Sequence, residues 1–103
     1  MPTRLNEFAI LIIGRQRRSQ VEWFAHAPIA AKAGLSADII TELKGNKRPS
    51  KMADDEAFVY DFVTELTTAH EVSDATFARA RKVFNEQQIV DLTAVLATMS
   101  LSR

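Results

Sequence analysis

The spacing of apolar residues is the feature that most restricts how this 103-residue chain can fold. Apolar side chains recur at intervals close to 3.6 residues almost throughout, which is the period of an amphipathic helix and not the alternation of a strand. Only three glycines and three prolines interrupt the pattern, so turn signals are few. A chain of this length has room for one hydrophobic core. The sequence therefore predicts a single all-α domain that spans residues 1–103.

Capping and turn residues divide this pattern into six expected helices. A serine at a helix start accepts a backbone N–H, and a glycine after a helix readily takes the left-handed conformation that ends it. In a capping box, two side chains three residues apart each bond the other's backbone. The expected helices are residues 5–18; residues 20–33, ended by Gly34; a segment capped by Ser36 that runs to Gly45; residues 54–69; a segment capped by Ser73; and a segment that begins with a capping box of Asn85 and Gln88.

Two interruptions and several apolar stripes complete this prediction. Pro28 lacks a backbone N–H and is expected to kink or loosen the second helix, while the polar residues 46–50 are expected to form a loop. The first helix is apolar on most sides and is expected to be central. The expected core residues are Leu5, Phe8, Ala9, Ile12 and Ile13 in the first helix; Phe58, Phe62, Val63 and Leu66 in the fourth; Phe77, Ala80 and Phe84 in the fifth; and Ile89, Leu92, Val95 and Leu96 in the sixth.

The charge balance argues against several kinds of partner. Thirteen basic and thirteen acidic residues give a formal net charge of zero, so no long-range field attracts nucleic acid or an anionic membrane. The apolar run from Phe8 to Ile13 is too short for a signal peptide or a membrane span, so a cytoplasmic location is expected. Zero net charge and a small core also favour self-association, and a homo-oligomer is expected.

The sequence contains no cysteine. Disulfides, thiolate metal sites and any peroxidase chemistry in which this chain supplies the sulfur are therefore excluded. The two histidines, His26 and His70, are far apart in the sequence, so neither a metal site nor a cofactor is expected. His70 lies near the end of an expected helix, where a partly charged imidazole is favourable, and it is expected to be structural or inert.

One cluster of titratable groups stands out in the first two expected helices. Ser19, Glu22 and His26 are spaced i, i+3 and i+7, which puts them on one helix face with the carboxylate beside the imidazole. Such a carboxylate can hold one imidazole tautomer, as general acid–base catalysis requires, but the same spacing also describes a solvated surface pair. The candidate residues of this region are Glu7, Arg18, Ser19, Glu22, His26 and the only tryptophan, Trp23.

A short basic cluster of Arg15, Arg17 and Arg18 ends the first expected helix. Clustered cations can bind phosphate. The zero net charge and the lack of interleaved aromatic residues favour a solvated helix end instead.

Two stretches of the sequence resemble the carboxymuconolactone decarboxylase-like family, which includes alkylhydroperoxidase D. The first stretch contains RLNEFAIL at residues 4–11, EWFAHAPIA at 22–30 and AGLS at 33–36. The second contains VSDATF at 72–77 and NEQQIVDL at 85–92. The resemblance implies an alkylhydroperoxidase D-like helical fold and assembly into trimers or hexamers.

The peroxidase branch of this family relays a proton through a glutamate and a histidine to a Cys-x-x-Cys pair. The resemblance places the glutamate at Glu7, the histidine at His26 and the two cysteines at Ser19 and Glu22. Peroxide reduction needs an oxidisable thiolate, which a serine hydroxyl cannot replace. The resemblance therefore implies a relative of the peroxiredoxin-type enzymes without their nucleophile.

The decarboxylase branch needs no Cys-x-x-Cys pair and applies acid–base groups to a carboxylated lactone. By this resemblance the chain is a carboxy-lyase in which His26 is the acid and Glu7 or Glu22 is its partner. Arg18 would hold a substrate carboxylate, and Ser19 and Trp23 would complete the substrate site. The alternative is a thiol-less relative that only binds a ligand or serves as an oligomeric assembly module.

Overall fold

The structure is a computed structural model that describes residues 1–69 and 71–101, with side chains described as far as residue 94. Six α-helices and no strand occur in these ranges, as the apolar spacing predicted. His70, Val95 and Leu96, which were assigned roles from the sequence, lie outside the described residues or side chains. The helices are α1 (Thr3–Gln16), α2 (Gln20–Lys32), α3 (Ala37–Lys44), α4 (Asp54–Ala69), α5 (Asp74–Val83) and α6 (Glu86–Leu101).

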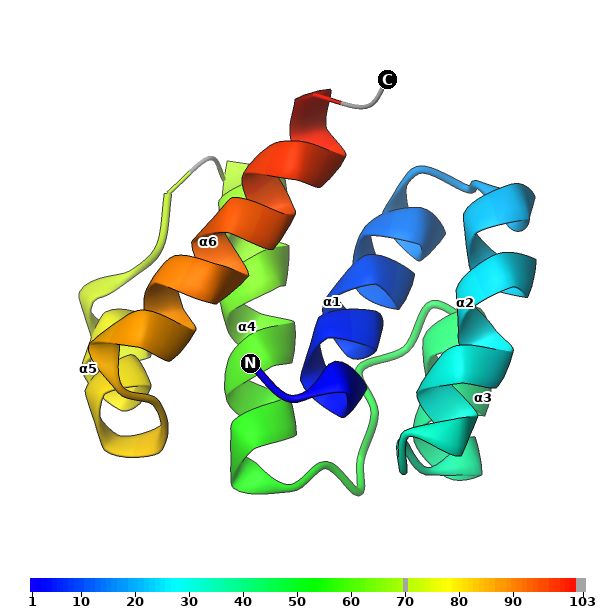
Figure 1. The fold of residues 1–103 in the computed structure, drawn as a ribbon, viewed down its shortest axis with the longest axis horizontal. Helices are drawn as coiled ribbons and strands as arrows, with labels where there is room; N and C mark the ends of the chain where they lie inside the picture. Colours follow the sequence, from blue (N-terminus) through cyan, green and yellow to red (C-terminus); the bar gives the residue numbers. More distant parts are fainter. Residues whose placement is uncertain (70, 102–103) are drawn as a thin grey trace.

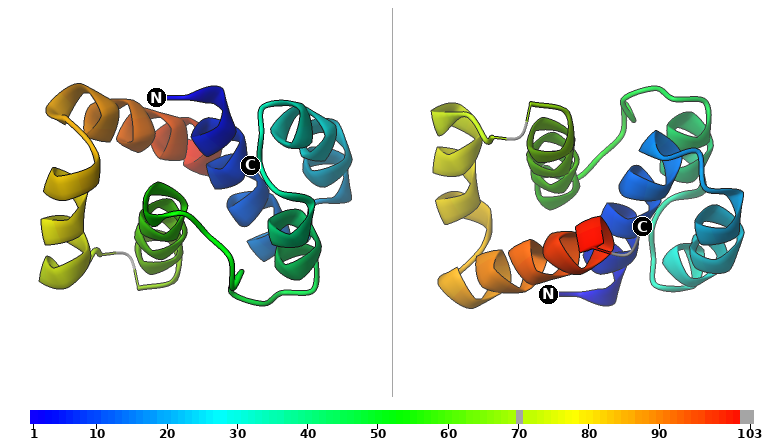
Figure 2. Two further views of the ribbon diagram at one scale, coloured as in Figure 1. Left: turned by 90° about the horizontal axis from the view of Figure 1, so that it is seen from below. Right: turned by 90° about the horizontal axis from the view of Figure 1, so that it is seen from above.

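Helix α1 is the centre of the fold. It packs against α2 and α3 on one side and against α4 and α6 on the other (Figure 1). The end-on views show α5 beyond α4, at the opposite end of the molecule from α2 and α3 (Figure 2). Buried residues lie on more than one face of α1, among them Leu5, Phe8, Leu11 and Ile12. The expectation of a central first helix is therefore confirmed.

The aromatic core lies between α4 and its neighbours. Phe58 is fully buried, and its ring centroid is 5.4 Å from that of Phe62 and 5.3 Å from that of Phe84. The prediction that Phe77 belongs to this core is wrong, because its side chain is 46% exposed. The buried face of α5 is made by Thr76 and Ala80, four residues apart, and Phe77 is turned about 100° away from Thr76 on the helix.

The first three helices end in the same hydrogen-bonded motif. After α1, α2 and α3 the chain reaches a positive φ at Arg18 (53°), Gly34 (107°) and Asn46 (62°). In each motif the N–H of that residue and of the next one donate to carbonyls of the last helical turn. Gly34 confirms its predicted role. Helix α1 ends at Gln16, earlier than expected, because the left-handed conformation of Arg18 stops it.

The other helix boundaries follow local signals. Ser19, Ser36 and Ser73 each accept a backbone N–H at a helix start, and Asn85 and Gln88 form the expected capping box. Helix α2 continues through Pro28, whose missing N–H removes one helical hydrogen bond without ending the helix. No helix within the described ranges has the length and apolar character needed to cross a membrane.

Candidate functional site

Three of the residues chosen from the sequence meet between α1 and α2. The Nδ1 atom of His26 lies 2.6 Å from Oε2 of Glu7, which comes from the neighbouring helix. Its Nε2 atom lies 3.8 Å from Oε2 of Glu22, one turn earlier on α2. The side chains are 13% exposed for Glu7, 29% for His26 and 35% for Glu22, so the trio is sheltered but reachable from solvent.

Close packing of the two helices makes this contact. A Cβ atom added to Gly14 would lie 3.3 Å from the Cβ of Glu22, so the missing side chain in α1 lets α2 approach. Glu7 lies two turns before Gly14 on α1, and His26 lies one turn after Glu22 on the antiparallel α2. Glu7 therefore reaches the imidazole from the neighbouring helix, whereas Glu22 reaches it from one turn earlier on the same helix.

The geometry assigns different roles to the two nitrogens of His26. An ionised carboxylate only accepts hydrogen bonds, so the 2.6 Å contact needs a proton on Nδ1 that is donated to Glu7. In the neutral imidazole Nε2 is then the unprotonated nitrogen, and the Glu22 oxygen at 3.8 Å is beyond hydrogen-bond distance from it. Nε2 is therefore the atom available to exchange a proton with a ligand.

The other three candidate residues gather at a different place. Arg18, Ser19 and Trp23 line a pocket of about 550 Å³ at the turn between α1 and α2. The remaining lining residues are Gly14, Arg15, Gln20, Phe24 and Lys44. Glu7, Glu22 and His26 do not line this pocket, so the six candidates form two groups and not one site.

Ser19 was expected to lie on the same helix face as His26 and to act as a functional group, but it is the N-cap of α2. Its hydroxyl oxygen accepts the backbone N–H of Glu22 at 3.3 Å and caps α2. The spacing also put Glu22 next to His26, whereas the shortest contact is with Glu7, 19 positions away in the chain. No local periodicity relates the two residues; the resemblance named Glu7 as one of two possible partners, and the packing of α1 on α2 makes it the nearer one.

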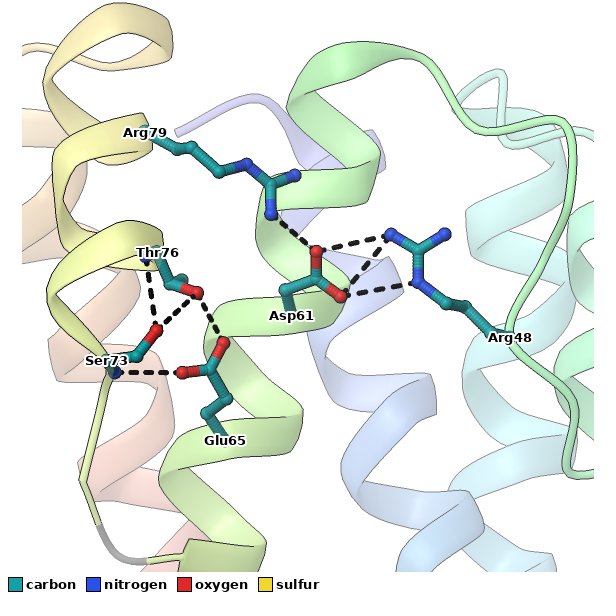
Figure 3. Close-up of polar contacts among 6 residues, drawn as sticks. All are labelled: Arg48, Asp61, Glu65, Ser73, Thr76 and Arg79. Atoms are coloured by element: carbon teal, nitrogen blue, oxygen red, sulfur yellow. Dashed lines mark hydrogen bonds and ion pairs between the residues drawn. The ribbon is translucent and has the colours of Figure 1, made fainter.

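A polar constellation that the sequence did not reveal joins α4 to its surroundings (Figure 3). Asp61 accepts hydrogen bonds from Arg79 of α5 at 2.5 Å and from Arg48 of the loop before α4 at 3.2 Å. Burial acts to raise the pKa of Asp61, but the hydrogen bonds from Arg79 and Arg48 outweigh it and the pKa is lowered. Arg48 also lies over the ring of Tyr60, with its guanidinium carbon 5.7 Å from the centroid. Asp61 thus holds the loop and α5 against α4.

Glu65, one turn further along α4, holds the start of α5 (Figure 3). Its carboxylate accepts the hydroxyl hydrogen of Thr76 and the backbone N–H of Ser73, the latter at 2.8 Å. The hydrogen bond from Thr76 is the main reason that the pKa of Glu65 is lowered, followed by that from Ser73. These contacts engage both oxygens of Glu65 and fix the N-terminus of α5.

Replacing Asp61 with asparagine is expected to destabilise the protein by about 1 kcal/mol at neutral pH, since both arginines are partly exposed. A carboxyl whose pKa is lowered by folding stabilises the protein above its unfolded pKa of about 3.9. That contribution disappears as the pH falls through the folded value. Urea unfolding should therefore separate wild type from Asp61→Asn at neutral pH, and the two curves should converge in strong acid.

The control for this prediction is Asp38→Asn. Asp38 pairs with Lys51 at 3.6 Å, but both side chains are mostly exposed, so little change in unfolding is expected at any pH. An equal and pH-independent loss in both variants would contradict the role assigned to Asp61.

Comparison with protein-family models, with curated proteins and with solved structures gives no match for this chain. Within the described residues there is also no group of three or more histidine, cysteine, aspartate or glutamate side chains placed to hold a metal ion. The two groups of residues between α1 and α2 are therefore the features that indicate a function.

Proposed function

We propose that this chain is an acid–base enzyme of the carboxymuconolactone decarboxylase-like type, which releases carbon dioxide from a small carboxylated lactone. The observation that carries the proposal is the 2.6 Å contact between His26 Nδ1 and Glu7 across two helices. A carboxylate in this position accepts the Nδ1 proton and holds the imidazole in one orientation, so that Nε2 faces a ligand, as a general acid requires. The sequence resemblance at residues 4–11 and 22–36 supports the same assignment.

The reaction needs a proton at the carbon that loses its carboxylate. When the C–C bond to the carboxylate breaks, carbon dioxide leaves and the electron pair stays on that carbon, delocalised toward the lactone carbonyl. His26 donates the proton on Nε2 to this carbon, and a new C–H bond forms. The imidazole is left with its proton on Nδ1, still donated to Glu7, and regains the second proton from water.

The charges around His26 suit this sequence of events. Glu7, at 13% exposure, is the better shielded of the two carboxylates and balances the imidazolium before the proton is transferred. Glu22 is more exposed and further away, so it contributes less to the orientation of the ring. In this proposal His26 is the catalytic residue and Glu7 is a positioning residue.

The direct test is to measure carbon dioxide release from small lactone carboxylates by the wild-type protein and by His26→Ala. Turnover that depends on His26 would support the proposal. Absence of turnover on a panel of lactone acids, or equal turnover by both proteins, would contradict it.

A second candidate function is assembly, and one observation favours it. Helix α2 exposes an apolar stripe at positions i, i+3, i+4, i+7 and i+8, and its large members are unusually open to solvent: Val21 is 82%, Phe24 66% and Ile29 44% exposed. The stripe consists of Val21, Phe24, Ala25, Pro28 and Ile29. Such a face on a small domain is typical of a surface that contacts another subunit.

If the stripe joins copies of this chain, sedimentation velocity should show an oligomer for the wild type and a smaller species for Val21→Glu. Val90→Glu provides the control, because Val90 is also exposed but lies on α6. A wild-type monomer, or an equal effect of both substitutions, would count against assembly through α2.

A further inference from the structure

We infer that the pocket at the turn between α1 and α2 binds a planar organic carboxylate, at a site separate from His26. The pocket has a volume of about 550 Å³, which is within the range of small-molecule sites. Three of its lining residues are cations, namely Arg15, Arg18 and Lys44, and none is a carboxylate. The sequence resemblance assigned Arg18, Ser19 and Trp23 to the substrate site of the His26 reaction, but no residue of the His26 trio lines the pocket. The inference therefore concerns a separate ligand site and goes beyond the proposed decarboxylation.

The cations of the pocket are not neutralised within the described part of the chain. The ion pairs found there involve other side chains. The Nε atom of Arg15 donates to the carbonyl oxygen of Lys44 at 3.0 Å. The two terminal nitrogens of the guanidinium take no part in that hydrogen bond. The Lys44 ammonium lies 5.8 Å from the ring centroid of Phe24. The pocket therefore carries positive charge that none of these ion pairs balances, which favours an anionic ligand.

The backbone at Arg18 distinguishes this helix end from the other two. Three helices end with a residue of positive φ, and two of them use glycine or asparagine, which take this conformation readily. The third uses Arg18, whose side chain strains the same motif. A residue held in an unfavourable backbone conformation at the edge of a pocket is typical of a functional position. Arg18 fits that description because its side chain lines the pocket.

The pocket lining also contains two aromatic residues, Trp23 and Phe24. Phe24 is 66% exposed and Trp23 lies beside it in the lining. A guanidinium matches a carboxylate with two parallel hydrogen bonds, whereas an aromatic face packs against a flat apolar body. A ligand that can bind the cations and also pack against the aromatic residues is a carboxylate carried on a planar ring or conjugated chain. A second carboxylate would pair with the remaining positive charge.

The test uses phthalate as the probe and Trp23 as the reporter. Trp23 is the only tryptophan, so its indole N–H gives a single cross-peak in a ¹H–¹⁵N NMR spectrum of the whole protein. We expect phthalate to shift this peak saturably, benzoate to do so more weakly, and neutral benzamide to leave it unchanged. Added salt should weaken the binding of phthalate.

Arg18→Gly is the decisive variant. Glycine adopts the positive φ of this position without strain, so we expect the variant to stay folded. It should weaken phthalate binding about tenfold, as expected for loss of one charge-assisted pair. Asn46→Gly makes the same backbone change at the end of α3, and Lys47→Gln removes a cation that does not line the pocket; neither should alter binding. His26→Ala should also bind phthalate normally, which separates this inference from the proposed reaction.

Three results would overturn the inference. Phthalate could leave the Trp23 peak unchanged at saturating concentration. Arg18→Gly could bind phthalate as well as the wild type does. Inorganic phosphate could shift the peak while the aromatic carboxylates do not, which would show an anion site without the aromatic half.

Discussion

His26→Ala is expected to lower kcat for carbon dioxide release by about 10²–10⁴-fold, the range for loss of a general acid. The effect is large because the neighbour of Nε2, the Glu22 carboxylate at 3.8 Å, is a proton acceptor and cannot replace the imidazole as a donor. The alanine leaves room for water, which is a poorer and unoriented acid at neutral pH. Far-UV circular dichroism and thermal unfolding should be close to wild type, since the imidazole is only partly buried.

Glu7→Leu tests whether Glu7 acts by positioning the imidazole. ¹⁵N NMR of wild-type His26 should show the neutral ring protonated on Nδ1, because that nitrogen faces the carboxylate at 2.6 Å. In Glu7→Leu the ring should revert to the Nε2-protonated tautomer that a free imidazole prefers, and kcat should fall with it. A merely structural role for Glu7 would not move the tautomer.

The matched control is Glu22→Gln. Glu22 lies 3.8 Å from Nε2 and makes no hydrogen bond to it, so the tautomer should stay on Nδ1 and the loss of kcat should be small. An unchanged tautomer in Glu7→Leu, or a larger effect from Glu22→Gln than from Glu7→Leu, would contradict the assignment of the orienting carboxylate.

Arg4→Met is expected to destabilise the fold by about 3 kcal/mol, because it leaves a buried carboxylate without its counter-charge. The Arg4 guanidinium bridges α1 and the start of α4, where it donates to Glu56 and, at 2.6 Å, to Asp55. The Glu56 side chain is only 7% exposed. The hydrogen bond to Asp55 raises the pKa of Arg4 against the opposing effect of burial, so the group stays charged.

A double variant separates charge from packing. Methionine keeps an apolar stem close in length to that of Arg4, and Arg4→Met with Glu56→Gln removes both charges while the amide oxygen can still accept the Ala53 N–H. The pair should therefore be less destabilised than Arg4→Met alone in urea unfolding. Arg81→Met, on the exposed face of α5, should change stability by no more than about 0.5 kcal/mol. A loss in Arg4→Met no greater than in this control would contradict the buried-pair argument.

Helix boundaries were predictable where a signal acts within a few residues. Gly34 ends α2, Ser73 caps α5, and Asn85 with Gln88 starts α6, because each signal depends only on hydrogen bonds to its own helix turn. Phe77 was assigned to the core from its aromatic character and spacing. That prediction was wrong because the face of α5 that is buried depends on how the helix packs against α4, which the periodicity of a short helix does not specify.

The candidate site was predictable only in part, for the same reason. Spacing along α2 related Glu22 to His26, and the family resemblance added Glu7, but the contact distance between Glu7 and the imidazole follows from the close approach of α1 at Gly14. Arg18, Ser19 and Trp23 are near His26 in sequence, yet they line a pocket that His26 does not reach. Arg48, Asp61 and Arg79 carried no common signal, because they come from a loop and two helices.

The sequence by itself determined the helical class, the helix ends marked by Gly34, Ser36, Ser73 and the Asn85–Gln88 capping box, the central place of α1 and the absence of thiol chemistry. These properties depend on composition, on the 3.6-residue period and on hydrogen bonds between near neighbours. The tertiary structure alone decided which carboxylate orients His26, which cations share a pocket and which residues hold α4 to α1 and α5. Those contacts join residues far apart in the chain, and their distances are set by how whole helices pack.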